Sequence, residues 1–381
     1  MRILFSGGGT GGHVYPILTV AAALKTLWLE RAPHPDAPLH LRYAGTAEGV
    51  EADLAARAGL DFTPIAAGQI RIRRPLKLAR NALRMARGIR QADALMRAWR
   101  PDVAFVTGGY VCGPVVWAAA RHDVPVLIYL PDITPGLGVQ RLARHAAAIA
   151  VSFPEVAAHF QGYDARILDT GYPVRPELRR RSMTKTQARL AFHLSPHLPT
   201  LLTFGGSRGA RAINQALAAA LPHVLQRMQV IHISGELDFA EAQKRASGLS
   251  PAQRERYRLF PYLHDEMVAA LHAADLAVAR SGASTLGEFP ALGLPAILVP
   301  LPISGGHQRH NARYLADRGA AIIVENDAMP TELLPAIQNL MTHPEGLQAM
   351  SRASAALARP RAAEAIATAL LDLGGNLQTR S

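Results

Sequence analysis

Short apolar runs alternate with longer helical patterns along the whole chain. In the first half, the β-type runs are Arg2–Ser6, Leu39–Ala44, Val103–Thr107, Val126–Tyr129 and Ala148–Val151. Alanine-rich segments with helical periodicity, such as Tyr15–Glu30 and Gly113–Arg121, fall between them. Alternation of this kind predicts an α/β fold, in which helices cover both faces of a parallel sheet.

The second half of the chain repeats this plan. Its predicted strands are Thr200–Phe204, Gln229–Ser234, Tyr257–Phe260, Leu276–Ala279 and Ala296–Pro300. The two halves also open alike, because FSGGGTGGH at Phe5–His13 is echoed by TFGGSRGAR at Thr203–Arg211. Each is a strand followed by a glycine loop and a helix, so we predict two doubly wound domains that bind ligands at the carboxyl ends of their strands.

The domain boundaries follow from changes in composition. We place the first domain at residues 1–172 and the second at 200–344. Residues 173–199 are rich in proline and arginine and lack clear periodicity, as is typical of a linker. Residues 345–381 read as an alanine-rich helical tail that we expect to pack back on the first domain.

The composition fits a folded protein with a large core, since 49% of residues are apolar and 18% are charged. No run of eighteen or more apolar residues occurs, and the opening apolar run is too short for a signal peptide or a membrane span. The single cysteine, Cys112, excludes an internal disulfide and a multi-cysteine zinc site. A reducing, cytoplasmic setting is therefore expected.

The net charge of +12 indicates an anionic partner, and the charge is concentrated in one segment. Arg71–Arg100 holds ten Lys/Arg residues and one acid, Asp93. Its apolar positions (Leu78, Ala82, Met85, Ile89) and its basic positions (Lys77, Arg80, Arg84, Arg87) lie on different sides of a predicted helix. This basic amphipathic helix is either a solvated surface or a dock for an anionic membrane leaflet. Nucleic acid is not expected, because no aromatic stacking platform runs among the arginines.

The glycine loop at Gly7–Gly12 lies between a predicted strand and a helix. Such a loop offers backbone N–H groups at the positive end of a helix dipole, although a plain tight turn also uses glycine. It is not a P-loop, because no Gly-Lys-Ser/Thr follows. Gly7, Gly9 and Gly12 satisfy GxGxxG, but no acid with a ribose role is evident at the required distance. His13 comes next and is either a general base or a residue that caps the helix and fills space.

A third loop, Arg280–Glu288, combines small residues and hydroxyls in a way that suits a pyrophosphate. Glu288 falls about one turn into the following helix, where it either accepts two hydrogen bonds from a ribose diol or complements the helix dipole. Gln308 and Asn311 lie near the start of a further helix. Their amides either read sugar hydroxyls or belong to the ordinary polarity of a helix N-terminus.

Seven motifs in order over nearly the whole chain carry a family resemblance. They are GGTGGHVYP at Gly8–Pro16, GGYVCGP at Gly108–Pro114, GYPVR at Gly171–Arg175, GGSRGA at Gly205–Ala210, SGASTLGE at Ser281–Glu288, GLPAILVPLP at Gly293–Pro302 and HQRHNA at His307–Ala312. With them the chain resembles the MurG-type UDP-N-acetylglucosamine:N-acetylmuramyl-(pentapeptide)-pyrophosphoryl-undecaprenol N-acetylglucosamine transferases. The resemblance implies the GT-B fold, two Rossmann-like domains whose parallel sheets face a central cleft, with the acceptor in the first domain and the donor in the second.

The resemblance also implies the roles of single residues. His13 is then the base near the acceptor hydroxyl, and Tyr110 and Asp132 are candidates on the acceptor side. The donor-binding set is Thr10, Gly11, Gly12, Asp132, Arg175, Ser207, Leu263, Ala283, Ser284, Thr285, Leu286, Gly287, Glu288, Gln308 and Asn311. Glu288 matches the family's ribose acid, and Leu263 or His264 its uracil contact.

The activity implied by the resemblance is an inverting glycosyl transfer. N-acetylglucosamine would pass from UDP-GlcNAc to the MurNAc 4-hydroxyl of lipid I, giving lipid II for peptidoglycan synthesis and so serving cell shape and division. The enzyme would be peripheral on the cytoplasmic side of the inner membrane, with the segment 71–100 at the anionic leaflet. No cofactor or metal site is implied, although Mg²⁺ bound to the substrate diphosphate would stimulate the reaction.

The chain departs from the family pattern after the strand Val126–Tyr129. The family usually carries Glu-Gln-Asn there, and this chain reads Leu130-Pro131-Asp132. Asp132 brings a carboxylate to the place of a ligand-binding amide, which keeps open a related GT-B transferase with another lipid or small-molecule acceptor. His307 stands where the family usually has an acid or glutamine. Two further alternatives are a UDP-GlcNAc epimerase, for which no flanking acid pair is seen, and a binding module without catalysis.

Overall fold

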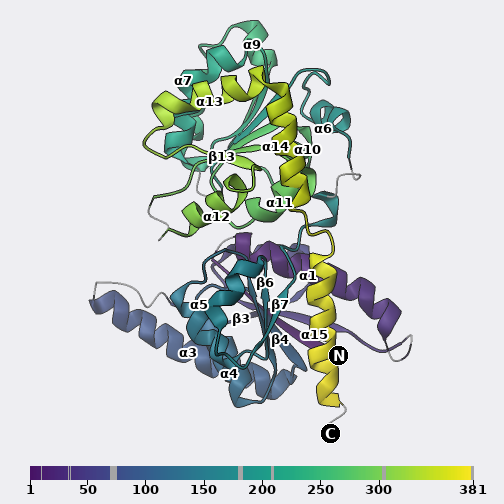
Figure 1. Ribbon diagram of the computed structural model, residues 1–381. Coiled ribbons are helices and arrows are strands. Elements are labelled where there is room, and N and C mark those ends of the chain that lie inside the picture. The colour runs from purple at the N-terminus through teal and green to yellow at the C-terminus, as the bar shows by residue number, and fades with distance from the viewer. Residues whose placement is uncertain are drawn as a thin grey trace. The chain divides into compact units, whose positions relative to one another are not determined.

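The computed structural model describes residues 1–9, 11–32, 34, 36–68, 75–178, 183–206, 210–302 and 306–378. The chain divides into two compact units. The first joins Met1–Pro173 to Arg361–Ser381, and the second is Val174–Pro360 (Figure 1). Each unit is a Rossmann-like α/β domain built on one parallel sheet, as the alternating sequence pattern predicts.

The first unit holds a seven-stranded sheet in the order β3-β2-β1-β4-β5-β6-β7. The strands are β1 (Arg2–Ser6), β2 (His40–Gly45), β3 (Asp61–Pro64), β4 (Val103–Val106), β5 (Val126–Leu130), β6 (Ala148–Val151) and β7 (Arg166–Asp169). Phe5 in the central strand pairs with Tyr43 on one side and Phe105 on the other, and all three are fully buried. Burial on both faces explains why the inner strands read as continuous apolar runs.

Two groups of helices flank this sheet (Figure 1). The helices are α1 (Gly11–Arg31), α2 (Val50–Arg57), α3 (Pro75–Trp99), α4 (Cys112–Arg121), α5 (Leu137–Leu142) and α15 (Ala362–Gln378). Helix α1 contacts α2 and α15, whereas α4 contacts α3 and α5. Short 3₁₀ turns follow at Ala143–His145 and Pro154–Phe160.

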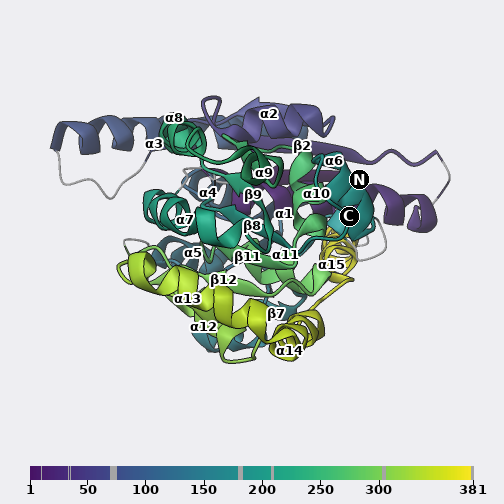
Figure 2. The same ribbon diagram turned by 90° about the horizontal axis from the view of Figure 1, so that it is seen from above.

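The second unit holds a six-stranded sheet in the order β10-β9-β8-β11-β12-β13. The strands are β8 (Thr200–Phe204), β9 (Gln229–Ile233), β10 (Tyr257–Phe260), β11 (Leu276–Ala279), β12 (Ala296–Leu298) and β13 (Ala321–Ile323). Its helices are α6 (Lys185–Ala191), α7 (Arg211–Val224), α8 (Phe239–Ala246), α9 (Pro251–Glu255), α10 (Glu266–Ala273), α11 (Thr285–Leu292), α12 (His307–Ala316), α13 (Met329–Thr342) and α14 (Pro344–Ala356). Helices α7 and α13 pack together over one face (Figure 2), where their apolar side chains form one core with β8, β9, β11 and β12.

Three strands of the structure, β3, β7 and β13, are absent from the sequence-based prediction. Each is the outermost strand of its sheet, and each has only three or four residues that are largely part-exposed. An edge strand buries little side chain, so its sequence lacks the apolar run that marks the inner strands.

The predicted linker at 173–199 is wrong in part, because it contains α6 and belongs to the second unit. Thr184 and Gln187 form a capping box at the start of α6. Arg189 is buried and donates to the carbonyl of Ala273 at 3.2 Å and to Asp275 at 2.6 Å. The partners of this arginine lie about 85 residues away in sequence, so composition alone did not reveal its burial.

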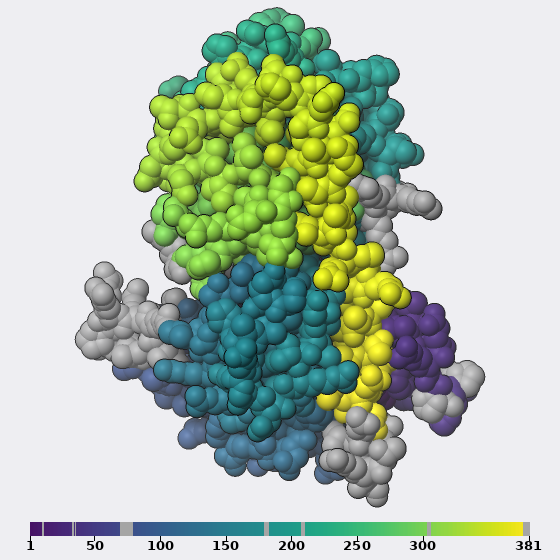
Figure 3. Space-filling model, in the orientation of Figure 1, coloured from purple at the N-terminus to yellow at the C-terminus, as the bar shows by residue number. Residues whose placement is uncertain are grey.

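The tail predicted at 345–381 is also divided between the units. Helix α14 packs on α11 within the second unit, where Ser351 Oγ donates to the Gly293 carbonyl at 2.7 Å. Only from Arg361 does the chain join the first unit, where α15 packs on α1 and buries Ile366 and Leu370 (Figure 3). The expected return of the tail to the first domain therefore applies to α15 alone.

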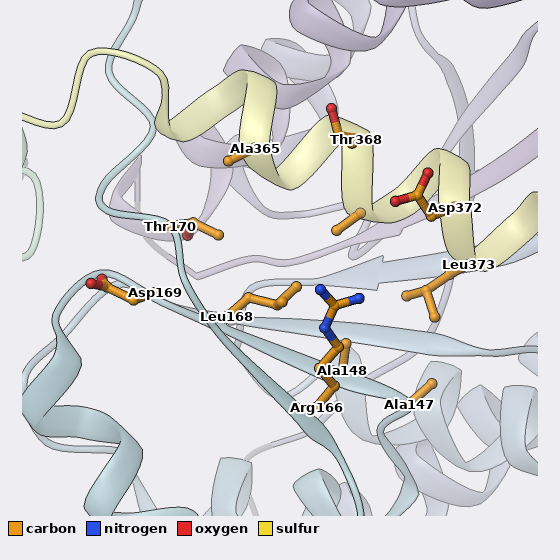
Figure 4. Close-up of a pocket in the computed structure, with 11 residues that line it drawn as sticks. Ala147, Ala148, Arg166, Leu168, Asp169, Thr170, Ala365, Thr368, Asp372 and Leu373 are labelled. Carbon is orange, nitrogen blue, oxygen red and sulfur yellow. The ribbon is translucent and has the colours of Figure 1, made fainter.

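Helix α15 also lines a small open cavity beside the edge strand β7. The cavity has a volume of about 280 Å³ and is lined by residues of β6, β7 and α15. Arg166 projects from β7 toward α15, which contributes Asp372 to the lining (Figure 4). The C-terminal helix thus packs on α1 and β4, and the cavity separates it from the edge strand.

A buried polar network crosses the core of the second unit. His232 on β9 is 2% exposed, and its ring hydrogen-bonds the Tyr257 hydroxyl at 2.7 Å and the Asn214 amide oxygen at 3.0 Å. Asn214 in turn donates to Asp238 at 2.9 Å. Burial lowers the pKa of His232 from 6.5 to about 4, against a smaller opposing effect of Asp238.

This network predicts an acid-sensitive second unit. The unfolded chain binds a proton at His232 near pH 6.5 and the folded chain only near pH 4, so stability is full above pH 6.5 and falls as the pH is lowered through that window. We expect His232 to account for a loss of about 3 kcal/mol in unfolding free energy between pH 7 and pH 4. Denaturant titrations at several pH values measure this loss.

The variant His232→Gln should lack that part of the pH dependence. The exposed His223, in α7 of the same unit, provides the control His223→Gln. An unchanged pH slope in His232→Gln would contradict the assignment.

Candidate functional site

Both sheets have a point at which the strand order reverses. In the first sheet it lies between β1 and β4, and in the second between β8 and β11. The loops that follow these strands are the ones the sequence marks with glycine and small residues: Gly7–Gly12, Gly108–Gly109, Gly205–Gly206 and Arg280–Ser284. Ligands of open parallel sheets bind at such switch points, so each unit presents one candidate site.

In the first unit, two glycine loops meet backbone to backbone. The N–H of Gly8 donates to the Gly108 carbonyl at 3.1 Å. Gly109 has a φ of +94°, and a Cβ at this position would lie 2.5 Å from the Gly8 carbonyl oxygen. A Cβ on Gly7 would lie 2.2 Å from the Thr107 hydroxyl. The loops therefore require glycine in order to approach this closely.

His13 stands in the first turn of α1 and is held by the same two loops. Its Nδ1 lies 3.2 Å from the carbonyl oxygen of Gly8. A carbonyl only accepts, so this contact assigns the proton to Nδ1 and the lone pair of the neutral ring to Nε2. Thr107 Oγ1 donates to the His13 carbonyl at 2.6 Å, and a Cβ on Gly108 would come within 3.0 Å of Nε2.

This geometry bears on the two interpretations of His13. Its ring bonds a loop carbonyl through Nδ1, whereas a helix-capping side chain accepts from the backbone N–H groups of the first turn. The tautomer places the basic nitrogen on the far side of the ring from that carbonyl. This orientation is one that a general base would require, and the role of His13 as the base stays a prediction.

The other residues predicted in the first unit follow neighbouring strands. Gly11 and Gly12 open α1, whereas Thr10 lies outside the described residues. Tyr110 follows β4 and is 50% exposed. Asp132 follows β5 and is partly buried. The described residues among them follow the carboxyl ends of their strands, and their contacts with a ligand stay predictions.

In the second unit, the loop after β11 is tied to the start of α12. Ser281 Oγ donates to the carbonyl of Gln308 at 2.7 Å, and Asn311 Nδ2 donates to the carbonyl of Ser281 at 3.1 Å. Gln308 Oε1 accepts from the Leu301 N–H at 2.9 Å. Asn311 is fully buried and supports the loop in this structure. Recognition of a sugar by Gln308 and Asn311 stays a prediction.

The predicted phosphate loop, Ala283–Gly287, forms a tight helix start. The N–H groups of Thr285, Leu286 and Gly287 donate to Gly282, Ala283 and Ser284 at 3.1, 3.2 and 3.1 Å. The hydroxyl of Thr285 also donates inward, to the Gly282 carbonyl at 2.6 Å. A diphosphate bound at this helix end would therefore share donors that the turn already uses.

Glu288 and Arg175 form a shielded ion pair within the second unit. Arg175 Nη2 lies 3.7 Å from Glu288 Oε1, and the two side chains are 18% and 12% exposed. Burial raises the pKa of Glu288, while the nearby charge of Arg175 opposes this shift. The predicted ribose acid and the predicted diphosphate cation are thus neighbours, although 113 positions separate them in sequence.

Two further predictions fall on the loop regions after β10 and β8. The side chain of Leu263 is 8% exposed and points into the core, so a contact with a base would use its backbone. His264 beside it is exposed and packs edge-on against Tyr262, with ring centroids 4.7 Å apart. Ser207 lies outside the described residues.

Sequence reasoning assigned no role to two buried charged residues beside these loops. Arg280 turns inward and donates to the Val299 carbonyl at 3.1 Å and to Asn326 at 2.9 Å. Glu51, on α2, is fully buried beneath the first glycine loop and accepts from the Gly9 N–H at 3.4 Å. Asn326 and Gly9 lie more than 40 residues from Arg280 and Glu51, respectively, so no local spacing in the sequence identified these contacts. Over the part of the chain that the structure describes, no group of three or more His, Cys, Asp or Glu side chains is placed to hold a metal ion.

Comparisons with known proteins agree with this architecture. The glycosyltransferase family 28 N-terminal domain matches residues 3–151, and the glycosyltransferase family 28 C-terminal domain matches residues 200–366. A solved structure titled as MurG of Acinetobacter baumannii superposes with a TM-score of 0.72 at 26% identity, covering 97% of this chain and 99% of that one.

Two curated relatives match over nearly their full length. Both are named UDP-N-acetylglucosamine--N-acetylmuramyl-(pentapeptide) pyrophosphoryl-undecaprenol N-acetylglucosamine transferase. The protein of Desulforudis audaxviator is 42% identical over 98% of this chain and 99% of its own, and that of Roseiflexus is 42% identical over 100% and 96%. The chain therefore belongs to glycosyltransferase family 28, and within it to the MurG-type N-acetylglucosamine transferases.

Proposed function

We propose that this chain transfers N-acetylglucosamine from UDP-GlcNAc to the MurNAc 4-hydroxyl of lipid I, giving lipid II and UDP. The observation that carries the proposal is the orientation of His13 by the Gly8 carbonyl at the switch point of the first sheet. Family membership supports both the donor and the acceptor.

The chemistry needs a base for the acceptor and a positive environment for the leaving group. As the 4-hydroxyl oxygen attacks the anomeric carbon of GlcNAc, its proton passes to Nε2 of His13. The bond between that carbon and the diphosphate oxygen breaks at the same time, and UDP leaves with the electron pair. Arg175 and the start of α11 supply the positive potential that stabilises the departing diphosphate. Direct displacement by one nucleophile inverts the anomeric configuration.

Donor recognition is assigned to the second unit. Glu288 is a shielded carboxylate that accepts hydrogen bonds from the ribose diol, and the backbone near Leu263 meets the uracil. The proposal requires no cofactor, and it assigns any stimulation by Mg²⁺ to the diphosphate of the substrate. Because Asp132 replaces the family's asparagine, a transferase with a different acceptor is the alternative. In the experiment below, that alternative predicts binding or hydrolysis of UDP-GlcNAc without transfer of GlcNAc to lipid I.

The first unit is assigned to a membrane surface. In the described part of the chain, no helix is long and apolar enough to cross a membrane. Helix α3 exposes Arg80, Arg84 and Arg87 together with Leu83, which is 73% exposed. Basic side chains beside an exposed leucine suit an anionic leaflet on the cytoplasmic side, where lipid I presents its head group.

The apolar positions that the sequence separates from the basic ones are only partly buried. The side chain of Leu78 lies outside the described part, and Ala82 is exposed. The residues that this helix buries are Asn81, Gly88, Ala92, Leu95 and Met96. The helix lies so close to Ala66 at Gly88 that a Cβ there would be 1.9 Å from the Ala66 carbonyl oxygen. This face of the helix therefore packs against the unit. Part of the apolar stripe is thus left for a membrane contact.

The first test is transfer of labelled GlcNAc to a soluble lipid I analogue by the purified protein and by His13→Ala. We expect the variant to lower kcat by about 10²–10⁴-fold, because it lacks the proton acceptor. KM for the donor should change little, since His13 lies in the acceptor unit. Label transfer that is equally fast in the variant would contradict the base assignment.

A second variant, Glu288→Gln, tests the donor site. Loss of a charge-assisted hydrogen bond should raise KM for UDP-GlcNAc by about 10–100-fold. Glu332→Gln is the matched control, because Glu332 is an exposed acid in the first turn of α13. If both variants bind donor equally well, Glu288 only complements its helix dipole.

Membrane docking is tested by sedimentation with vesicles that contain anionic lipid. Replacing Arg80, Arg84 and Arg87 by Gln should weaken binding by about 3 kcal/mol, or about 100-fold, at low salt. Added salt should weaken binding of the unmodified protein in the same way. The control replaces the exposed Arg227, Arg245 and Arg352 of the second unit, which removes the same charge. Equal loss in both triple variants would show that only net charge matters.

A further inference from the structure

Glu51 is a buried acid directly beneath the glycine loop that carries His13. It belongs to the first turn of α2 and is fully buried. A Cβ on Gly8, Gly45 or Gly49 would lie 2.5, 2.7 or 2.2 Å from its side-chain atoms. Three glycines, from the loop after β1 and from the segment between the end of β2 and the start of α2, thus make room for this one side chain, which the reaction as described above does not use.

The carboxylate of Glu51 is satisfied by donors of the loops around it. Oε1 accepts from the Thr46 N–H at 3.0 Å and from the Thr46 hydroxyl, and Oε2 accepts from the Gly9 N–H at 3.4 Å. An ionised carboxylate only accepts, so three converging donors match the charged form.

The Gly9 N–H and the Gly8 carbonyl belong to the same peptide group. The N–H side of this peptide faces Glu51, and its carbonyl side accepts from Nδ1 of His13 at 3.2 Å. A peptide group is planar and conjugated, so hydrogen bonds on its two sides polarise one another. Negative charge at the N–H side makes the carbonyl a stronger acceptor for the proton on Nδ1.

The other ionisable groups packed under these loops are neutral. Tyr43 on β2 donates to the Gly7 carbonyl at 2.8 Å, and Cys112 on α4 donates to the Gly108 carbonyl at 3.0 Å. Burial raises the pKa of the Tyr43 hydroxyl well above its usual range and that of the Cys112 thiol to about 11. Of these three groups, Glu51 alone supplies negative charge to the loop.

We propose that Glu51 is a positioning residue that acts on His13 through the Gly8–Gly9 peptide. It holds the ring in the Nδ1–H tautomer and stabilises the imidazolium that forms when Nε2 takes the acceptor proton. The Nδ1 proton stays on the ring and the carboxylate stays ionised throughout, so one proton moves, from the hydroxyl to Nε2. The proposal rests on the proposed role of His13 as base.

The test compares pH–rate profiles of the full-length protein and of Glu51→Gln. Without the negative charge, the ring gives up its second proton more readily, so the acid limb of kcat should move to lower pH by about 0.5–1 unit. A weaker base should also lower the plateau of kcat by about 10-fold, with little change in either KM. Glu48→Gln is the matched control, because Glu48 lies three residues earlier and its side chain is 84% exposed.

A double-mutant cycle separates positioning from mere support of the fold. In a His13→Ala background, Glu51→Gln should cost nothing further in kcat, because the group it acts on is gone. An unmoved acid limb, or a full additional loss in that background, would overturn the proposal. If His13→Ala alone leaves transfer unchanged, the assignment of His13 as the base is wrong. That result needs no Glu51 variant, so it is distinguishable from a failure of the positioning role.

A spectroscopic measurement on the unmodified protein needs no variant to fold. The ¹⁵N NMR spectrum of histidine-labelled protein reports which ring nitrogen of His13 carries the proton, with His13→Ala giving the assignment. The proposal requires the proton on Nδ1 near neutral pH. A ring protonated on Nε2 would exclude the contact through the Gly8 carbonyl and overturn the proposal.

Discussion

The first unit depends on a close approach of backbone to backbone between the loops after β1 and β4. This approach is possible only because Gly7 and Gly109 carry no Cβ. It allows the hydrogen bond from the Gly8 N–H to the Gly108 carbonyl, which joins the two loops. This contact also fixes His13, because its ring bonds to the Gly8 carbonyl and its own carbonyl accepts from Thr107. At Gly7 and Gly8, the opening run of glycines is therefore a packing requirement.

In the second unit, side chains rather than glycines hold the loop at the switch point. Its loop after β11 is braced by Asn311 and by Arg280, both buried and both bonded to backbone carbonyls. Such bracing fixes the loop and the start of α11 without any ligand. The shielded pair of Glu288 and Arg175 adds one acceptor and one cation at the same end of the unit.

Buried charge is placed with partners in both units. Arg189 binds two carbonyls and Asp275, and Glu51 accepts from Thr46 and Gly9. An unpaired ion in a protein interior costs several kcal/mol, so removing one partner of such a set is more harmful than the strength of the bond suggests. Composition does not reveal these buried residues, because Arg and Glu are usually found on the surface of a protein.

The sequence by itself determined the fold class, both halves of the architecture and the family, because these rest on apolar runs, glycine loops and motif order along the chain. It also placed His13 and Glu288, whose neighbours in sequence mark them as the first residues of a helix. Tertiary structure decided what depends on distant partners: the edge strands β3, β7 and β13, the pairing of Arg189 in α6 with Asp275, and the return of α15 to the first unit. It also decided the pairing of Arg175 with Glu288 and the placement of Glu51 under the glycine loop. These features follow from contacts between segments far apart in sequence, which a local pattern does not contain.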